Sequence, residues 1–215
     1  MIRHFPCFAL LALAAGCREA PSPVAPATTN ETEAAEAIAP LADVVRVRLD
    51  TDAGPILLAL DYAKAPVTTT NFVRYVDQRR FDGTFFYRAA RTRGSKERGF
   101  IQGGIRHSAR KALPPIAHEP STRTGLRHVD GTVSMARAAP VGAMGDFFII
   151  VGGAMPGMDA KGDDPGFAAF GRVEAGMDVV RRILAAPTYP NAGRGPMRGQ
   201  MIERPVRIVT ARRVE

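Results

Sequence analysis

The chain has 215 residues, of which 46% are hydrophobic, and a formal net charge of +8. This length allows one domain with a sizeable core, once an N-terminal segment without globular character is set aside. The basic balance names no partner by itself. No RNP-like aromatic tract, zinc-finger spacing or long Lys/Arg block accompanies it, so we expect no dedicated nucleic-acid module. Both cysteines fall within the first 17 residues, which excludes a disulfide framework in the rest of the chain.

Residues 1–16 have the pattern of a signal peptide. An apolar run from Phe5 to Ala15 follows a basic start and is too short to cross a bilayer as an ordinary helix. The run ends in Leu-Ala-Ala-Gly-Cys at residues 13–17, which resembles the bacterial lipobox, whose cysteine is acylated and becomes the mature N-terminus. This resemblance implies an exported protein held at a membrane by a lipid on Cys17. Because Arg18 replaces the aspartate of inner-membrane retention, it implies an outer-membrane lipoprotein on the periplasmic side. The alternative is an ordinary secretory peptide with an incidental cysteine.

Residues 17–43 are predicted to form the lipidated N-terminus and a disordered linker. From Arg18 to about Asp43 the sequence consists largely of Pro, Ala, Thr and Glu, with few large apolar side chains. Such a segment buries too little surface to offset the entropy of its chain. The folded domain is therefore predicted to occupy residues 44–215.

The predicted domain opens with a β-hairpin. Val45, Val47 and Leu49 alternate with charged residues, which is the period of a strand with one face in water. Turn-forming residues at positions 52–55 separate this strand from an apolar run at residues 56–60. The domain is therefore expected to start with two antiparallel strands.

Two helices and several short strands follow the hairpin. Thr68 is a suitable N-cap for the first helix. The apolar faces of the two helices are formed by Phe72, Tyr75 and Val76, and by Met177, Val180 and Leu184. The other periodic segments are short and rich in β-forming residues, at 132–136, 147–151, 168–173 and 206–211. Many short strands with two helices predict a β-barrel or a β-sandwich.

The sequence carries no signature of a metal site or a bound cofactor. None of the four histidines takes part in a helical metal-ligand spacing such as H-E-x-x-H, and Walker, G-x-G-x-x-G and nucleophile-elbow motifs are missing. We therefore expect no metal and no cofactor. A Ser/His/Asp triad built from distant parts of the chain stays open, because such triads assemble in space rather than in sequence.

The most informative stretch is Phe-Asp-Gly-Thr-Phe-Phe-Tyr-Arg at residues 81–88, followed by Gly-Phe-Ile-Gln-Gly-Gly at residues 99–104. Arg88 comes at the end of an apolar, strand-like run. On composition alone, this arginine is either a surface charge on an edge strand or a hydrogen-bond donor placed beside a hydrophobic groove. The local pattern does not separate these two interpretations.

These motifs resemble the hallmark of the cyclophilins, a Tyr-Asp-Gly-Thr-x-Phe-His-Arg strand followed by Gln-Gly-Gly. Three further tracts agree with the family in order and spacing, at residues 65–72, 131–149 and 170–180. The resemblance covers nearly all of residues 44–215. It implies a mainly β fold, a closed eight-stranded antiparallel β-barrel capped by two α-helices, and peptidyl-prolyl cis-trans isomerase activity.

The resemblance also implies the residues of a site. Arg88 would donate hydrogen bonds to the twisted prolyl amide, and Gln102 would orient Arg88. The substrate would contact Phe86, Phe100, Ile101, Met135, Ala136, Phe148, Met158 and Phe167. The sequence departs from the family at Gly99, Asp146 and Gly157, where a pocket phenylalanine, a glutamine and a tryptophan or phenylalanine are usual. We expect these changes to affect catalytic efficiency and sequence preference, and Gly157 to weaken the binding of cyclosporin-like ligands.

The expected partners are proline-containing segments of exported proteins and the membrane that holds the lipid, and we expect a monomer. Two other functions stay open. A cyclophilin-shaped holdase or scaffold would grip proline-containing segments without useful turnover. The basic surface could instead bind anions or nucleic acid, with an affinity that falls steeply as salt is added.

Overall fold

The computed structural model describes residues 41–106, 108–138 and 142–215. The predicted signal peptide at residues 1–16, the predicted lipidation site Cys17 and the predicted linker as far as residue 40 lie outside the described residues. The strands are β1 (Val44–Thr51), β2 (Gly54–Asp61), β3 (Thr84–Arg91), β4 (Gly99–Gly104), β5 (Thr132–Ala138), β6 (Gly142–Val151), β7 (Ala168–Ala175), β8 (Thr188–Tyr189) and β9 (Met201–Val214). The helices are α1 (Pro66–Asp77), α2 (Ser121–Thr124) and α3 (Met177–Ala185), with 3-10 turns η1 (Pro156–Met158) and η2 (Gly195–Met197).

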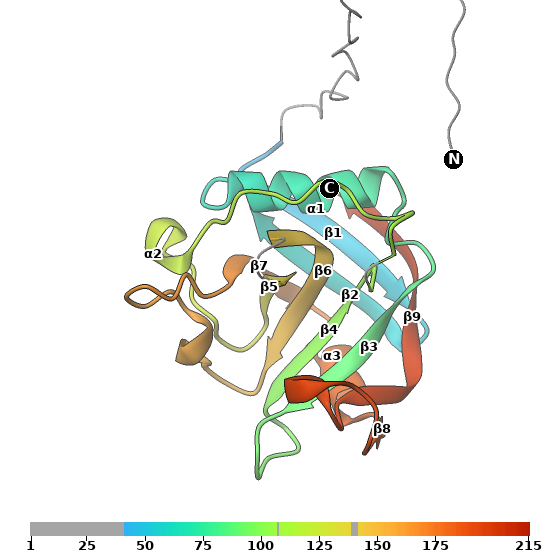
Figure 1. Cartoon of the computed structure of the whole chain (residues 1–215). Coiled ribbons are helices and arrows are strands. Elements are labelled where there is room, and N and C mark those ends of the chain that lie inside the picture. The colour runs from blue at the N-terminus through green and yellow to red at the C-terminus, as the bar shows by residue number, and fades with distance from the viewer. Residues whose placement is uncertain (1–40, 107, 139–141) are drawn as a thin grey trace, which may run out of the picture. The chain divides into compact units, whose positions relative to one another are not determined.

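The strands form a closed antiparallel barrel (Figure 1). Its order is β1-β2-β7-β5-β6-β4-β3-β9, and the pairing of β1 with β9 completes the ring. The short strand β8 pairs with β9 alone and adds a small extension to the sheet. The eight-stranded barrel is therefore confirmed, and the alternative of a β-sandwich is excluded.

The two predicted helices are confirmed as α1 and α3. Figure 1 shows them at opposite ends of the barrel. The predicted apolar face of α1 is buried, and Val180 and Leu184 of α3 are buried as well, whereas Met177 is only partly covered. The four-residue helix α2 was not predicted, because it is too short to show a helical period. Within residues 41–106, 108–138 and 142–215, no helix combines the length and the apolar character needed to cross a bilayer.

The N-cap predicted for α1 is wrong. The helix begins at Pro66, after Ala65, and no side chain of the capping position bonds to it. The buried carboxylate of Glu119 takes this role, because it accepts hydrogen bonds from the backbone N–H groups of Val67 (3.2 Å) and Thr68 (2.7 Å) and from the Thr68 hydroxyl (2.7 Å). A negative charge is favourable at this end of the helix dipole. Local capping rules missed it because the partner lies 51 residues further along the chain.

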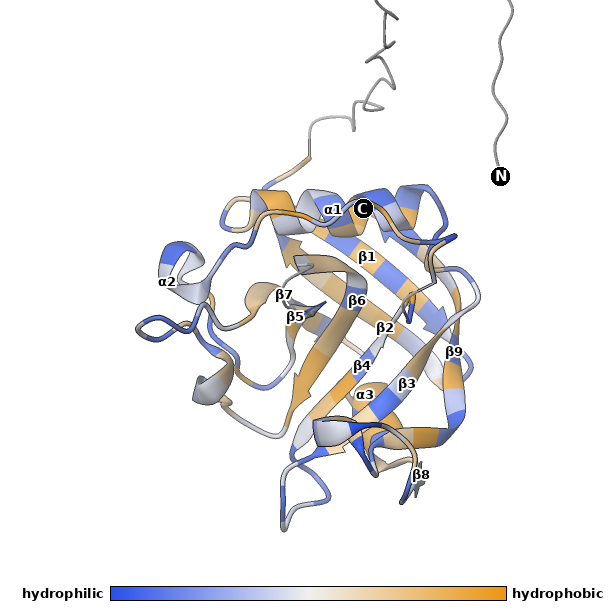
Figure 2. Cartoon of the chain, in the orientation of Figure 1, coloured by the Kyte–Doolittle hydropathy of each residue, from blue (hydrophilic) through white to orange (hydrophobic). Residues whose placement is uncertain are grey.

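The barrel interior is filled by alternate residues of each strand. In β1, Val45, Val47 and Leu49 point inward and are buried, while the intervening residues are exposed. Figure 2 shows this as alternating orange and blue along the strand. Aromatic rings fill the end of the core under α1, where Phe72 and Phe147 meet edge to face with their centroids 5.2 Å apart. This alternation decides which residues of each motif remain outside the core.

Candidate functional site

A β-bulge in β3 places two polar side chains next to each other outside the core. The pairing of β3 with both of its neighbours, β4 and β9, shifts register between Phe86 and Arg88. Phe86 and Ala89 both belong to the barrel core, with two residues between them instead of the single residue that regular alternation allows. Tyr87 and Arg88 therefore both lie on the outer face of the barrel.

The guanidinium group of Arg88 is held by two glutamines. Its Nη1 donates a hydrogen bond of 2.8 Å to Oε1 of Gln102 on β4, and its Nε donates one of 2.8 Å to Oε1 of Gln200, the residue before β9. The guanidinium carbon lies 4.9 Å from the ring centroid of Phe100, a cation–π contact. Burial lowers the pKa of Arg88 from its ordinary value, but a guanidinium starts so high that it remains a cation at any ordinary pH.

A chain of hydrogen bonds fixes the orientation of Gln102. Its Nε2 donates to the hydroxyl of Tyr87 (2.8 Å), and that hydroxyl donates to Oδ1 of Asp146 (3.2 Å), which also accepts from the backbone N–H of Arg106 (2.9 Å). Burial raises the pKa of Tyr87, and the charge of Asp146 adds to the effect, so the hydroxyl keeps its proton. Because that proton goes to Asp146, the hydroxyl receives the NH₂ group of Gln102. The carbonyl oxygen of Gln102 then faces Arg88.

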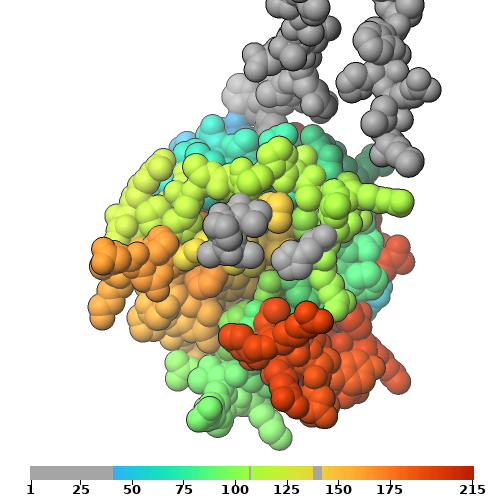
Figure 3. Space-filling view, in the orientation of Figure 1, coloured from blue at the N-terminus to red at the C-terminus, as the bar shows by residue number. Residues whose placement is uncertain are grey.

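Arg88 borders a cavity of about 230 Å³. The cavity has an aromatic wall, in which the ring centroid of Phe148 lies 5.3 Å from that of Phe100 and 5.3 Å from that of Phe167. The lining residues are Arg88, Phe100, Gln102, Ala136, Arg137, Gly142, Met144, Asp146, Phe148, Met158, Phe167 and Met197. Figure 3 shows this face, with the orange segment that contains η1 and the red segment that precedes β9 on two of its sides. The site thus combines an oriented cation with an apolar slot.

Two larger hollows in the described part of the chain do not have this combination. They have volumes of about 560 and 680 Å³ and lie beside α3, and they are lined by residues such as Ile56 and Val179 in one case and Arg98 and Arg181 in the other. Neither lining contains an aromatic side chain. Across the described ranges, no group of three or more His, Cys, Asp or Glu side chains is placed to hold a metal ion. The cavity at Arg88 is therefore the candidate site.

The structure brings most of the predicted site residues together. Those that line the cavity are Arg88, Phe100, Gln102, Ala136, Phe148, Met158 and Phe167. Phe86, Ile101 and Met135 lie instead in the barrel core, with at most 1% of their surface exposed. The expectation that these three contact the substrate is therefore corrected. Ile101 and Met135 are sequence neighbours of lining residues, and strand alternation turns them to the opposite face.

Two glycines mark departures from the family pattern, and they have different causes. Gly99 has φ of +154°, and a Cβ atom at this position would lie 2.1 Å from the carbonyl oxygen of Ala90. The present backbone therefore excludes the phenylalanine that is usual here. Gly157 is exposed, and a Cβ atom there would meet no described atom within 4 Å. The rim of the cavity beside Met158 is therefore open.

Several residues of the site were missed by sequence reasoning. The lining residues that were not predicted as site residues are Arg137, Gly142, Met144, Asp146 and Met197, while Gln200 contacts Arg88 directly. Met197 and Gln200 come from the segment between α3 and β9, which lies outside all the tracts that carried the resemblance. No local motif marks this segment. Arg137 is next to the predicted Ala136, and its guanidinium carbon lies 5.5 Å from the ring centroid of Phe167.

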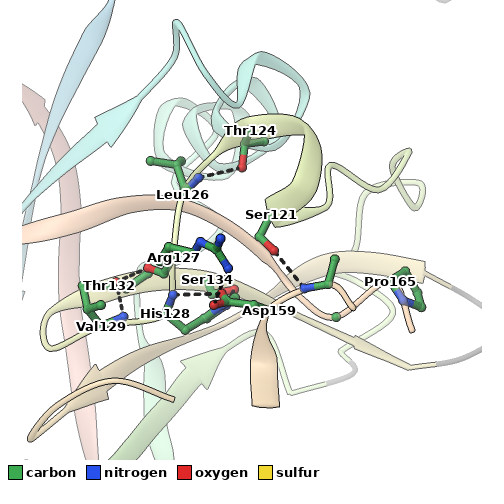
Figure 4. Close-up of polar contacts among 12 residues, drawn as sticks. Ser121, Thr124, Leu126, Arg127, His128, Val129, Thr132, Ser134, Asp159 and Pro165 are labelled. Carbon is green, nitrogen blue, oxygen red and sulfur yellow. Dashed lines mark hydrogen bonds and ion pairs between the residues drawn. The ribbon is translucent and has the colours of Figure 1, made fainter. Parts of the chain in front are cut away.

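Figure 4 shows a buried cluster of Ser134, His128 and Asp159, which lies behind the aromatic wall. Nδ1 of His128 lies 2.7 Å from Oδ1 of Asp159, and its Nε2 lies 2.9 Å from Oγ of Ser134. The imidazole stacks on Phe148, with centroids 5.9 Å apart and planes 14° apart. Burial lowers the pKa of His128, with Asp159 opposing this, so the ring is neutral at pH 7. Because His128 is 1% and Ser134 0% exposed, no substrate reaches this cluster, and it does not support hydrolase chemistry.

Comparisons with known proteins agree with this geometry. Residues 46–212 match the family described as cyclophilin type peptidyl-prolyl cis-trans isomerase/CLD. Peptidyl-prolyl cis-trans isomerase A of Dickeya dadantii is 40% identical over 147 residues, which cover 66% of this chain and 72% of that protein. A peptidyl-prolyl cis-trans isomerase of Acinetobacter baylyi is 34% identical over 168 residues, covering 76% of this chain and 82% of that protein.

Solved structures show the same fold. A crystal structure of a cyclophilin type peptidyl-prolyl cis-trans isomerase of Cryptosporidium parvum has a TM-score of 0.61 at 17% identity and covers 80% of this chain and 98% of that chain. A second structure of that protein, in the presence of the dipeptide Ala-Pro, has a TM-score of 0.60 at 18% identity and covers 79% and 99%. Taken with the sequence matches, these findings show that the chain belongs to the cyclophilin-type peptidyl-prolyl cis-trans isomerase family.

Proposed function

We propose that Arg88 catalyses the cis-trans isomerisation of prolyl peptide bonds by stabilising the twisted amide. The observation that carries the proposal is the guanidinium group held by Gln102 and Gln200 at the edge of an apolar cavity. A cation that is fixed in place before the substrate arrives needs little reorganisation when the substrate reacts. The arrangement therefore favours a role for Arg88 in the reaction over a role as a surface charge.

The chemistry requires only hydrogen bonding and shape. A prolyl amide resists rotation by about 18–20 kcal/mol, because the nitrogen lone pair is delocalised into the carbonyl group. Twisting the bond localises that pair on the nitrogen, which then accepts a hydrogen bond better than in either planar state. An N–H of Arg88 that binds the nitrogen at this point stabilises the twisted state selectively, and this is catalysis by differential binding. No covalent bond forms or breaks, and no proton is transferred.

The proline ring of the substrate is proposed to bind against the aromatic wall. Phe100, Phe148, Met158 and Phe167 offer apolar surface to the cavity that Arg88 borders. Burying the ring there would fix the position of the amide nitrogen relative to the guanidinium group, and holding two reacting groups in place accounts for a large part of many rate enhancements. The substrates would therefore be proline-containing segments with access to this face.

Replacing Arg88 tests the mechanism. Arg88→Ala is expected to lower kcat/KM on an Ala-Pro reporter peptide by about 10² or more, the scale for losing one preorganised donor. Arg88→Lys keeps the charge but loses the planar fork, so it is expected to recover only part of the activity. Arg181→Ala is the matched control, because it removes an exposed arginine of α3 whose partner is Asp130. Full turnover by Arg88→Ala would reject the mechanism.

A second candidate function is a peptide-binding chaperone with little turnover. The open rim at Gly157 favours it, because a rim without a large side chain at this position restrains a proline ring less firmly. This function depends on the apolar wall and not on the guanidinium group. It predicts that Phe148→Ala weakens suppression of client aggregation while Arg88→Ala does not. If Arg88→Ala matched the wild type both in isomerase activity on the reporter peptide and in suppression of client aggregation, this function would be favoured over catalysis by Arg88.

We also propose that the protein acts on exported proteins while anchored by a lipid on Cys17 at the periplasmic side of the outer membrane. The support is the sequence of residues 1–18. Uncatalysed prolyl isomerisation takes tens to hundreds of seconds, so a local isomerase would speed a slow folding step. Cys17→Ser is expected to move the protein from the membrane fraction to the soluble fraction, with isomerase activity unchanged. Continued fractionation with the membrane would refute the lipid anchor.

A further inference from the structure

Gln200 holds the edge of the Arg88 guanidinium group that Gln102 does not reach. Gln102 accepts from Nη1 and Gln200 accepts from Nε, each at 2.8 Å. The two glutamines come from separate parts of the chain, one from β4 and the other from the segment before β9. They therefore bind two different nitrogens of one planar group.

Two acceptors restrict the guanidinium group more than one does. A single hydrogen bond at Nη1 leaves the plane free to pivot about that contact, whereas a second bond at Nε fixes the direction of the plane. Of the five N–H donors of a guanidinium group, these two bonds use two, and within the described part of the chain the other three are left for a substrate. The ring of Phe100, 4.9 Å from the guanidinium carbon, packs against the group that the glutamines hold.

The backbone of Gln200 is anchored independently of its side chain. Its carbonyl oxygen accepts a hydrogen bond of 2.9 Å from the backbone N–H of Ala89, the residue after Arg88. Its own N–H donates to the carbonyl oxygen of Met197 (3.2 Å), and the next residue, Met201, lies opposite Arg88 in the pairing of β3 with β9. A substitution at position 200 can therefore remove the side-chain acceptor and leave this pairing in place.

From this geometry we propose that Gln200 is a positioning residue for the isomerisation reaction, acting through Arg88. The inference rests on the proposed function, because it requires that Arg88 contact the prolyl amide. Gln200 aims the N–H groups that face the cavity and does not itself touch the substrate. Its removal should therefore lower kcat and leave KM nearly unchanged, since the apolar wall that binds the proline ring is intact.

The test compares Gln200→Leu with Gln200→Glu in the full chain. Leu has a similar size but accepts no hydrogen bond, and we expect kcat on an Ala-Pro reporter peptide to fall about tenfold, within the range for a misplaced catalytic group. Glu keeps an oxygen acceptor for Nε and is expected to recover most of the activity. In NMR spectra, the Nε–H resonance of Arg88 should shift and lose protection from solvent exchange in Gln200→Leu and not in Gln200→Glu.

A double-mutant cycle separates positioning from a general structural effect. If Gln200 acts through Arg88, then adding Gln200→Leu to Arg88→Ala should cause no further loss of kcat. An equal loss in both backgrounds would overturn the inference, and so would full kcat in a folded Gln200→Leu protein when Arg88→Ala alone is impaired. Full turnover by Arg88→Ala would overturn the proposed function and the inference together, so the two failures are distinguishable.

Discussion

The hydroxyl of Tyr87 joins Gln102 to Asp146, and replacing Tyr87 by Phe tests whether this chain of bonds aims Arg88. The hydroxyl accepts a hydrogen bond of 2.8 Å from Gln102 and donates one of 3.2 Å to the Asp146 carboxylate. A neutral hydrogen bond contributes about 1 kcal/mol net, and one to a charged group about 1.5–3 kcal/mol. Because the bond to Asp146 is long, its contribution belongs near the lower limit. We expect Tyr87→Phe to lower the free energy of unfolding by about 2–3 kcal/mol.

The same variant should reduce activity by a smaller factor than Arg88→Ala. Gln102 can still accept from Arg88, but its amide group loses one of the two contacts that favour the present orientation over the flipped one. A preference of about 1 kcal/mol corresponds to roughly 85% of the correct orientation, and losing it leaves roughly 50%, so we expect kcat to fall by at most about twofold. Urea unfolding followed by circular dichroism measures the stability, and a protease-coupled assay on an Ala-Pro reporter peptide measures kcat.

Tyr75→Phe is the matched control for this prediction. The hydroxyl of Tyr75 is also buried and accepts a hydrogen bond of 2.8 Å, from the backbone N–H of Leu113, but Tyr75 does not line the cavity. This control should lose stability and keep kcat. Unchanged kcat in Tyr87→Phe, or an equal fall of kcat in both variants, would refute the proposed coupling of Tyr87 to Arg88.

The packing around the site and at the start of α1 can be tested at Gly99, His128 and Glu119. Gly99→Ala should lower the free energy of unfolding by about 1–3 kcal/mol or more, because glycine tolerates this backbone conformation and the carbonyl oxygen of Ala90 blocks a side chain. Urea unfolding measures this loss, and Gly157→Ala, as the control, should be nearly neutral in the same titration. The free energy of unfolding should fall as the pH drops below about 6.5, because the unfolded state then binds a proton at His128 that burial disfavours in the folded state. His128→Gln should flatten that profile, and an unaltered slope would contradict the assignment. Glu119→Gln should lower the free energy of unfolding by about 1.5–3 kcal/mol, because it removes the charge that accepts hydrogen bonds from the first N–H groups of α1. Thermal unfolding measures this loss, and a value below about 0.5 kcal/mol would show that the cap contributes little.

The strands and long helices could be predicted because their signals are local. Val45, Val47 and Leu49 show the period of a strand within a few residues, and Val180 and Leu184 show that of a helix. Closure of the barrel has no such signal, because it depends on β1 pairing with β9 from the other end of the domain. The resemblance to the cyclophilins supplied what the local pattern did not. Local rules failed where the partner was distant, as with Glu119 at the start of α1.

The site was predictable to the extent that it lies within short motifs. The motifs identified Arg88 and Gln102, but a run of neighbouring residues does not say which of them face the cavity. Ile101 and Met135 were therefore grouped with the lining although they point into the core. The bulge at Tyr87 adds to this difficulty, because it interrupts the alternation without a sequence signal of its own. Gln200 was beyond reach for another reason, since it meets Arg88 only through the tertiary fold.

Because β9 is the last strand to be made and closes the barrel, the site is completed only late in folding. A chain still emerging from the ribosome already contains Arg88 and Gln102, but until Met201–Val214 has been made the sheet has two unpaired edges. Gln200 directly precedes that strand. The closed barrel and the hydrogen bond between Arg88 and Gln200 therefore form together, as a late, non-local event of the kind that slows folding. A nascent or truncated chain that ends before β9 should have neither a closed barrel nor an Arg88 side chain oriented by both glutamines.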